Sequence, residues 1–555
     1  MLSALLVPLL LQALLLSSVS AAPIGLRIPK IDPKKILCQL SFVEKFLCPE
    51  GGLNALSRVT PLGTASGVLD PDGAHRYPVR YASAARWAPS TLVNSWELPN
   101  GSNNVSALPL ACPQNDVSSS TYSEDCLSMV LYVPPSLNPL TSNAPVLVWI
   151  HGGSFVVGSA TSTGIDGSKL ALATNSIVAV PQYRLGALGF LAPSGNTNLA
   201  VKDVVNALEF VKRVAPSFGG SASKVTLAGQ SAGASMIRAV LSAPSASSLF
   251  RSVILHSDPI NFGHLRPATH QIIANDFKTR VGCSSASCQN GLSLSAILSA
   301  QSATYDNAVN TNAAAGTGQP IRPVLDGTFI TTPFDTTAPF PSINKPLLVT
   351  SVENEAAWAI FKSFPPLLDE GAFPFFTGLT FGNQRTPVIL DSPFYTPAPG
   401  SIVDGKVDGR FQLEKLGTDY LWKCSGWTFS RAWAQAGGNA FVGQFVLGAT
   451  YPGNEDVPRC TQNGVVCHQD DIQIVFGTVV NPTEEQSALT SQIQQQYKAF
   501  LNNGNPNAAG LPTWNAATTT DVRPLRLGGT GEVDVGACDP SFWGSEVQYD
   551  YQFYN

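Results

Sequence analysis

The sequence has little charge. Asp, Glu, Lys and Arg make up 13% of its 555 residues, against ~25% in an average globular domain. The formal net charge is −5, and no run of Lys and Arg is long enough to bind a row of phosphates. Proteins that bind nucleic acid carry basic patches that neutralise phosphates. We therefore expect no nucleic-acid partner.

Metal-binding patterns are missing as well. No two of the ten cysteines are spaced as C-x-x-C, and the six histidines are scattered along the chain. Structural zinc sites are built from Cys and His ligands at short, regular spacings. We therefore expect no bound metal.

A long apolar run occurs once, at the N-terminus. Residues 2–16 are apolar at all but three positions, and small residues follow up to residue 22. About 15 residues are too few to cross a bilayer, which takes about 20, and the pattern is typical of a signal peptide covering residues 1–21. A retained anchor is the alternative, because the first residues carry no Lys or Arg. We expect a secreted, extracellular protein without an integral membrane span.

The ten cysteines agree with an oxidising destination. Four pairs lie close in sequence and suggest local disulfides: Cys38 with Cys48, Cys112 with Cys126, Cys283 with Cys288, and Cys460 with Cys467. Cys424 and Cys538 remain for a long-range bridge, although spacing alone does not determine connectivity. Two sequons in a polar segment predict N-glycans at Asn100 and Asn104.

Apolar runs alternate with helical patterns from about residue 145 onward. Buried strands are expected at 145–150, 177–183, 224–229, 252–256 and 346–351, and helices at 203–214 and 232–242. Strands that alternate with helices predict a mainly parallel sheet covered by helices, an α/β fold. We expect an N-terminal extension over 22–74 and one domain over 75–555.

The segment 360–410 is rich in Phe, Pro and Gly, which predicts irregular loops over a pocket. Its aromatic residues either line an apolar substrate site or belong to the core: Phe361, Phe364, Phe373, Phe375, Phe376 and Phe381. The sequence does not favour one of these two roles over the other.

The motif Gly229-Gln-Ser231-Ala-Gly233 matches G-x-S-x-G. It follows an expected strand and opens an expected helix, as a nucleophile elbow does. Such an elbow holds the serine in a strained turn, and glycines two positions away relieve the crowding. The alternative is a helix that merely begins with small residues. The context predicts that Ser231 is a nucleophile.

A second glycine-rich turn, His151-Gly-Gly-Ser-Phe155, also follows an expected strand. Its backbone N–H groups at Gly153 and Ser154 would bind the oxyanion of a tetrahedral intermediate. The amide of Ala232, at the start of a helix, would complete this oxyanion hole. The alternative is an ordinary tight turn.

These segments resemble the type-B carboxylesterase/lipase family. The likeness runs from about residue 75 to 545 and includes residues 123–127, 148–155, 183–190, 218–220, 225–233 and 323–327. It implies the α/β-hydrolase fold and the hydrolysis of carboxylic esters through an acyl-enzyme, a chemistry that needs no metal or organic cofactor. The expected substrate is a small-molecule or lipid ester.

The resemblance also implies an acid and a base that follow the serine in the chain. Glu355 stands at the place of the acid, with alanine after it where the family usually has glycine, and Glu353 is the rival. His468 opens the histidine motif, and His151 is its competitor near the site. His468 would accept the proton of Ser231 while the acid orients the imidazole.

Other features of the family follow the same likeness. Three of the cysteine pairs match its common disulfides, namely Cys112 with Cys126, Cys283 with Cys288 and Cys424 with Cys538, and the remaining two pairs would be additions. Arg86 with Glu124, and Arg184 with Asp203, would form buried ion pairs that hold the framework.

The sequence departs from the family near the serine. Gln230 replaces the usual glutamate, which removes a negative charge, and the loop between Cys112 and Cys126 has only 13 residues and no Trp. Both changes disfavour a cationic alcohol such as choline. Serine also replaces a glycine at Ser154 and an aspartate at Ser221. We expect neutral, apolar esters as substrates, and the alternative is a non-catalytic binding protein of the same fold.

Overall fold

The computed structural model describes residues 56–549 except 116, 284 and 338, and the described residues belong to one compact unit. The expected signal peptide and the pair Cys38 and Cys48 lie outside the described residues. Two short strands, β1 (Ser57–Thr60) and β2 (Gly63–Ser66), pair with each other in the part of the N-terminal extension that is described.

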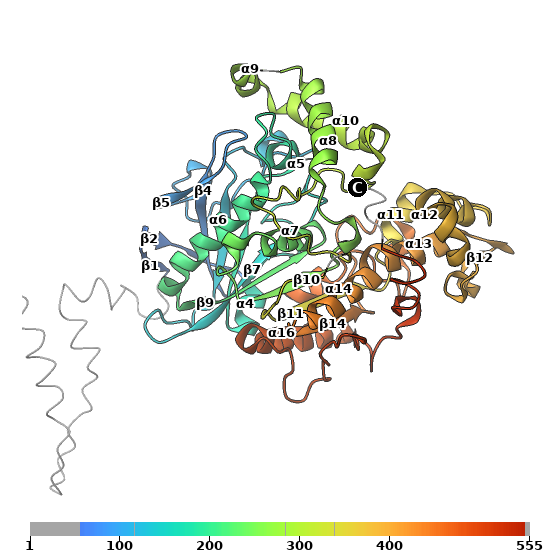
Figure 1. Cartoon of the computed structure of the whole chain (residues 1–555). Helices are drawn as coiled ribbons and strands as arrows, with labels where there is room; N and C mark the ends of the chain where they lie inside the picture. Colours follow the sequence, from blue (N-terminus) through green and yellow to red (C-terminus); the bar gives the residue numbers. More distant parts are fainter. Residues whose placement is uncertain (1–55, 116, 284, 338, 550–555) are drawn as a thin grey trace, which may run out of the picture. The chain divides into compact units, whose positions relative to one another are not determined.

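The centre of the fold is an 11-stranded sheet in the order β15–β14–β11–β10–β9–β7–β8–β6–β4–β3, with β5 beside β4 (Figure 1). The strands from β15 to β8 run parallel, and β6, β4, β3 and β5 form an antiparallel edge. Their bounds are β3 (Val68–Leu69), β4 (His75–Ser83), β5 (Thr91–Glu97), β6 (Ser128–Val133), β7 (Ala144–Ile150), β8 (Ile177–Pro181), β9 (Gly220–Gln230), β10 (Ser252–His256), β11 (Leu347–Val352), β14 (Ala440–Phe445) and β15 (Leu525–Leu527). Because β3 pairs with β4, the sheet begins before residue 75.

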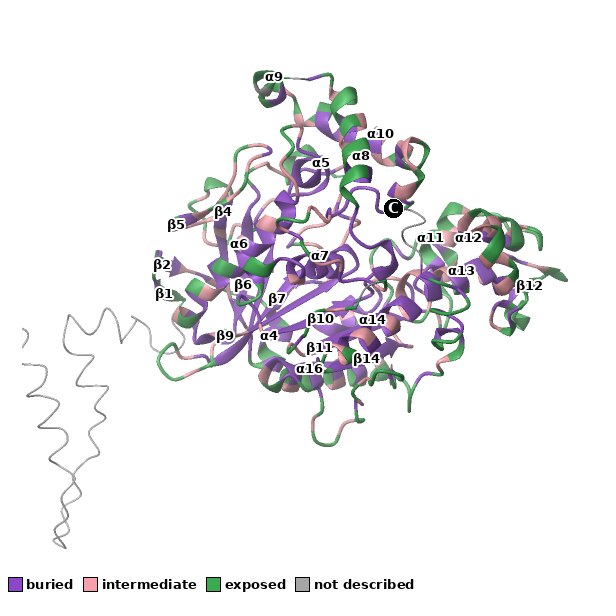
Figure 2. Cartoon of the chain, in the orientation of Figure 1, coloured by how far each residue is buried: buried purple, intermediate pink, exposed green. Residues whose placement is uncertain are grey.

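Helices cover both faces of the sheet, so the central strands appear as buried ribbons in Figure 2. Alternate residues of β7 enter different cores, because successive side chains of a strand point to opposite faces. Val146 and Val148 pack with α6 (Leu199–Val214) and α7 (Ala232–Leu241). Leu147 and Trp149 pack with α4 (Ser168–Thr174) and α16 (Glu484–Asn503).

The remaining helices extend the fold beyond the sheet. In Figure 1, α8 and α10 pack side by side, and α11, α12 and α13 form a separate group. Their bounds are α5 (Gly186–Phe190), α8 (Pro267–Val281), α9 (Ala286–Gly291), α10 (Leu294–Thr311), α11 (Ala357–Ser363), α12 (Ala372–Leu390), α13 (Arg410–Thr418), α14 (Cys424–Gln435) and α15 (Ile472–Phe476). A two-stranded ribbon of β12 (Ile402–Val403) and β13 (Lys406–Val407) precedes α13. No helix among the described residues is both long and apolar enough to cross a membrane.

The expected strands and helices are present, with ends that move by a few residues. The prediction of irregular loops over 360–410 is wrong for the middle of this segment, because α12 occupies residues 372–390. Its glycines and prolines suggested loops, but Gly382, at φ 69°, only interrupts α12. Phe373 and Phe381 are buried in a third hydrophobic core, whereas Phe375 is 60% exposed. Most of the aromatic content of this segment therefore serves packing.

Covalent and ionic contacts fasten the framework, and of the two ion pairs expected to be buried Arg184–Asp203 is buried, whereas Arg86–Glu124 is partly exposed. Four disulfides are present, Cys112–Cys126, Cys283–Cys288, Cys424–Cys538 and Cys460–Cys467. The buried Arg184 donates to both carboxylate oxygens of Asp203, each at 2.7 Å. Arg86 pairs with Glu124 and also donates to backbone oxygens near α9, so it ties two loops together.

Candidate active site

Ser231 occupies a sharp turn between β9 and α7. Its backbone has φ 57° and ψ −125°, a conformation that non-glycine residues rarely adopt, and its N–H donates to the backbone oxygen of His256 at 2.9 Å. The residue is 7% exposed. Strained backbone of this kind persists where the surrounding structure enforces it, commonly at active sites. The geometry is that of a nucleophile elbow.

The two glycines of the motif are required by close packing against β7. A Cβ atom on Gly233 would lie 2.1 Å from the backbone oxygen of Ile150, and one on Gly229 would lie 2.7 Å from the same atom. Both distances are far below van der Waals contact. The turn that carries Ser231 can approach β7 only because these positions have no side chain.

The loop after β7 lies against the serine. A Cβ atom on Gly152 would be 3.1 Å from Cβ of Ser231. The next three residues, Gly153, Ser154 and Phe155, all have positive φ values of 110°, 51° and 64°. Three consecutive positive φ values make the backbone of this loop curve tightly, next to the residue that precedes α7. The loop that carries Gly153 and Ser154 therefore lies close to the turn that carries Ser231, and their role as oxyanion donors with Ala232 stays a prediction.

Glu355 and His468 meet directly. Glu355 follows β11, is 1% exposed, and places Oε2 2.5 Å from Nδ1 of His468. Its other oxygen accepts the N–H of Val352 at 2.9 Å, which orients the carboxylate. Glu353, the rival, is an exposed residue whose own N–H donates to the backbone of Phe445. The structure therefore brings Glu355 to the histidine.

The second nitrogen of His468 faces Gln230. The amide Nε2 of Gln230 lies 3.2 Å from Nε2 of the imidazole, and no hydrogen bond joins Ser231 Oγ to His468 among the described residues. The indole ring of Trp422 packs beside the imidazole, with 5.5 Å between ring centroids. Trp422 lies in a π-helical turn, Asp419–Lys423, a rare geometry that is frequent at functional sites.

A buried carboxylate supports the turn that carries His468. Asp470 accepts the backbone N–H groups of Tyr451 and Cys467, and the side-chain amide of Asn454. Burial raises the pKa of Asp470 to about 7 in spite of these donors. Asn454 also donates to the backbone oxygen of His468 at 2.9 Å. Sequence reasoning missed both residues, although Asp470 lies within the histidine motif.

A second buried histidine stands behind the elbow. His256 Nδ1 is 2.7 Å from Asp471 Oδ2 and 2.9 Å from Thr350 Oγ1, and its Nε2 is 2.5 Å from the hydroxyl of Tyr497. The side chain is fully buried between the sheet and α16. The sequence carried no signal for this network. The network ties α15 and α16 to the end of β10. The backbone oxygen of His256, the last residue of β10, accepts the hydrogen bond from the N–H of Ser231.

His151 opens the loop of residues 151–155 after β7, called the oxyanion loop from here on, and its ring is engaged by other groups. Its ring stacks on Tyr183 with 4.5 Å between centroids, and Nδ1 is 2.9 Å from the backbone oxygen of Gly152. Burial lowers the pKa of His151 to about 4, so the ring is neutral near pH 7. These contacts suit a structural support of the loop.

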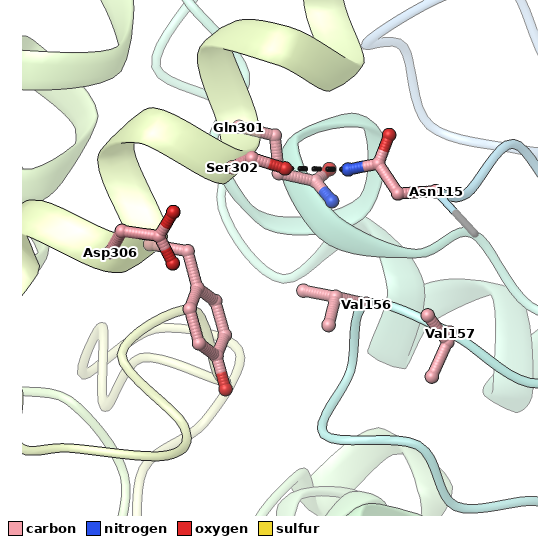
Figure 3. A pocket seen from close by; sticks show the side chains of 7 residues that line it. Asn115, Val156, Val157, Gln301, Ser302 and Asp306 are labelled. Atoms are coloured by element: carbon pink, nitrogen blue, oxygen red, sulfur yellow. Dashed lines mark hydrogen bonds between the residues drawn. The ribbon is translucent and has the colours of Figure 1, made fainter.

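A cavity of about 310 Å³ borders the oxyanion loop (Figure 3). Its lining comes from three segments, namely the residues after Phe155, the helix α10 and the loop closed by the Cys112–Cys126 disulfide: Asn115, Val156, Val157, Gln301, Ser302, Tyr305 and Asp306. Asn115 donates to Ser302 across it at 2.6 Å. The cavity mixes polar and apolar groups, and Asp306 is its one charged lining residue.

The expected glycosylation sites lie on the surface. Asn100 and Asn104 are both exposed. Asn100 also uses its side chain locally, donating to the backbone oxygen of Leu108 at 3.0 Å and accepting the N–H of Leu110. Attachment of glycans at these positions stays a prediction.

The sheet, the elbow and the Glu355–His468 contact define a protein of the α/β-hydrolase class. The profile of the Carboxylesterase family matches residues 74–537, and the chain belongs to this family. The resemblance inferred from the sequence motifs is thereby confirmed.

Individual relatives agree with this assignment. The chain is 29% identical over 420 residues to the crystal protein of Dictyostelium discoideum, covering 72% of each chain. It is 27% identical over 468 residues to carboxylesterase 1D of Rattus norvegicus, covering 77% of this chain and 80% of that one. A solved thermophilic PNB esterase superposes with a TM-score of 0.69 at 22% identity, covering 85% of this chain and 95% of its own. A second PNB esterase gives 0.68 at 23% identity, and both show the shared fold.

Proposed function

We propose that this protein is a secreted serine carboxylic ester hydrolase that works through an acyl-enzyme, with Ser231 as nucleophile, His468 as base and Glu355 as the orienting acid. The observation that carries the proposal is the 2.5 Å contact between Glu355 and His468 beside the strained turn of Ser231. Membership of the carboxylesterase family supports ester hydrolysis as the reaction.

The reaction begins when the proton of Ser231 Oγ passes to Nε2 of His468 and the oxygen attacks the ester carbonyl. The oxyanion that forms accepts hydrogen bonds from the N–H groups of Gly153, Ser154 and Ala232. His468 then gives its proton to the departing alkoxide, and the alcohol leaves an acyl-serine behind. A water molecule, deprotonated by His468, attacks the acyl-serine. The bond from the acyl carbon to Ser231 Oγ then breaks, His468 returns the proton to Oγ, and the acid is released.

Glu355 sets the tautomer of the base. Its carboxylate accepts a hydrogen bond from Nδ1–H of His468, so Nε2 of the neutral ring carries the lone pair that deprotonates the serine. The N–H of Val352 holds the other carboxylate oxygen in place. When Nε2 becomes protonated, the buried negative charge stabilises the imidazolium.

The surroundings of the base favour a neutral ester. Gln230 brings no charge to Nε2, and the ring of Trp422 gives an apolar wall next to the position where the alcohol departs. The cavity beside the oxyanion loop carries Asp306, which disfavours anionic substituents. We propose neutral esters of mainly apolar acids and alcohols, from small molecules to lipids.

The proposal is tested by following hydrolysis of p-nitrophenyl esters from acetate to palmitate. The secreted protein and its Ser231→Ala variant are compared, with circular dichroism to show that both are folded. Turnover by the wild type and its loss in the variant would support the mechanism. A folded wild type that is inert across the whole series would contradict it and favour a binding protein.

Secretion is tested separately. The full chain is expressed in a eukaryotic secretion host, and the protein recovered from the medium is sequenced from its N-terminus. A mature start at residue 22 or 23 is expected. Retention of the intact chain in the cell membrane would contradict cleavage and support an anchor.

A further inference from the structure

The side chain of Gln230 has one partner and one free atom. It is the last residue of β9, directly before Ser231, and is fully buried. Its Nε2 lies 3.2 Å from Nε2 of His468. Its Oε1 is buried and has no hydrogen-bond partner in the described part of the chain. That oxygen faces the oxyanion loop, because a Cβ atom on Gly152 would lie 2.8 Å from it.

The tautomer of His468 determines which amide atom faces the ring. Because Nδ1 donates its proton to Glu355, Nε2 of the neutral imidazole is an acceptor. The NH₂ group of Gln230 can donate to it, whereas the amide oxygen in the same place would set two acceptors against each other. In the resting protein Gln230 therefore donates to Nε2 and fixes the orientation of the ring.

The hydrogen-bonding role of His468 Nε2 reverses during the reaction. Once Nε2 has taken the proton of Ser231 it becomes a donor, and the NH₂ group of Gln230 would then repel it. A half-turn of the carboxamide would present Oε1 instead. This rotation breaks no other hydrogen bond of Oε1, since that atom has no other partner among the described residues.

We propose that Gln230 is a positioning residue that serves both protonation states of the base, donating to Nε2 of neutral His468 and accepting from Nε2–H of the imidazolium. This inference rests on the proposed function and goes beyond it. A carboxylate at this position could serve the protonated ring alone. The neutral carboxamide thus allows the base to remain unprotonated, and the protein to remain active, at more acidic pH than a glutamate would.

The groups packed around the imidazole differ in the ring nitrogen that they face. Glu355, at the end of β11, contacts Nδ1. Trp422, from the π-helical turn, is uncharged. Asp470, on the same turn as His468, directs its oxygens to Tyr451, Asn454 and Cys467. Among the described side chains in contact with His468, residue 230 is the one that faces Nε2, so a charge placed there acts on that nitrogen directly.

The test compares Gln230→Glu with Gln230→Met, which has a similar size and no hydrogen bonds. The pH dependence of kcat/KM is measured between pH 4 and 9 on one p-nitrophenyl ester. For Gln230→Glu we expect the midpoint of the acid limb to move toward alkaline pH by about one unit or more, as a carboxylate favours a protonated neighbour. Gln230→Met should lower the plateau roughly tenfold with a smaller shift, because it can neither donate nor accept. Gln495→Glu, on the exposed surface of α16, is the control for added charge and should leave the profile unchanged.

A second readout needs no turnover. The imidazole signals of His468 are titrated by NMR in the Ser231→Ala protein, with and without Gln230→Glu. In the protein with Gln230→Glu, the midpoint of the His468 titration should shift in the same direction and by the same amount as the acid limb of kcat/KM. The inference would be overturned if His468 titrated at the same pH with and without Gln230→Glu, or if a folded Gln230→Met variant kept its full activity. An inert wild type would refute the proposed ester hydrolysis instead, and the titration would still decide the role of Gln230.

Discussion

Glu355 and His468 are joined by a 2.5 Å contact between Oε2 and Nδ1, although they are 113 positions apart in the chain. The contact links the carboxyl end of β11 to the turn before α15. It predicts different effects for the substitutions Glu355→Gln and Glu353→Gln. Glu355→Gln would lose the buried charge that fixes the tautomer, so kcat should fall roughly 10³- to 10⁴-fold. Steady-state kinetics on a p-nitrophenyl ester measures this loss.

Glu353→Gln is the control for that experiment, because Glu353 is exposed and two residues away. Its kcat should stay within about twofold of wild type, as expected for a surface change without a partner in the reaction. A large loss in Glu353→Gln and none in Glu355→Gln would reverse the assignment of the acid.

Packing of the elbow against β7 gives a prediction on stability. In Gly233→Ala the new Cβ would lie 2.1 Å from the backbone oxygen of Ile150, so the turn must move. We expect the free energy of unfolding to fall by roughly 2–3 kcal/mol or more, and activity to fall with it. Urea denaturation followed by fluorescence measures the change. Gly378→Ala in α12 meets no atom within 4 Å and should leave stability unchanged or slightly raised.

The buried His151 makes stability depend on pH. Its pKa in the folded protein, about 4, is below the ordinary value of 6.5 because burial disfavours the charged ring. The unfolded chain therefore binds the proton more readily, and stability is full above pH 6.5 and is lost as pH falls toward 4. The loss amounts to roughly 3 kcal/mol for this group.

His151→Phe keeps a ring to stack on Tyr183 and cannot take up a proton. Urea midpoints measured from pH 4 to 7 should fall less steeply for this variant than for the wild type. Burial also lowers the pKa values of His264 and His270, so part of the slope will remain. Parallel curves for the two proteins would show that His151 is not a source of the acid sensitivity.

The position of Trp422 beside His468 predicts an effect on one half of the reaction. Because the alcohol departs next to the imidazole, Trp422→Leu should change acylation more than deacylation. For a series of alcohols esterified to one acid, kcat/KM should change by about threefold to tenfold with the bulk of the alcohol, as aromatic contacts of this kind are worth ~1 kcal/mol. The deacylation rate of the shared acyl-enzyme, from stopped-flow bursts, should stay constant. Equal changes in both steps would place Trp422 on the acyl side.

Features carried by short stretches of sequence are predictable. The elbow at Ser231, the oxyanion loop and the strands before them each lie within about ten residues, where periodicity and glycine placement carry the information. The loop prediction for the segment 360–410 fails for the same reason, since local composition says nothing about the core that Phe373 and Phe381 complete with distant elements.

The partners of His468 arise only when the chain is folded. The resemblance favoured Glu355 over Glu353, but only the folded chain shows which of the two carboxylates meets His468. Gln230 is 238 positions from the imidazole that it contacts, and no local pattern encodes whether the serine or the amide reaches Nε2. Side chains from separate strand ends meet because a parallel sheet gathers its carboxyl ends at one edge, and the packing of the whole domain selects the atoms that touch.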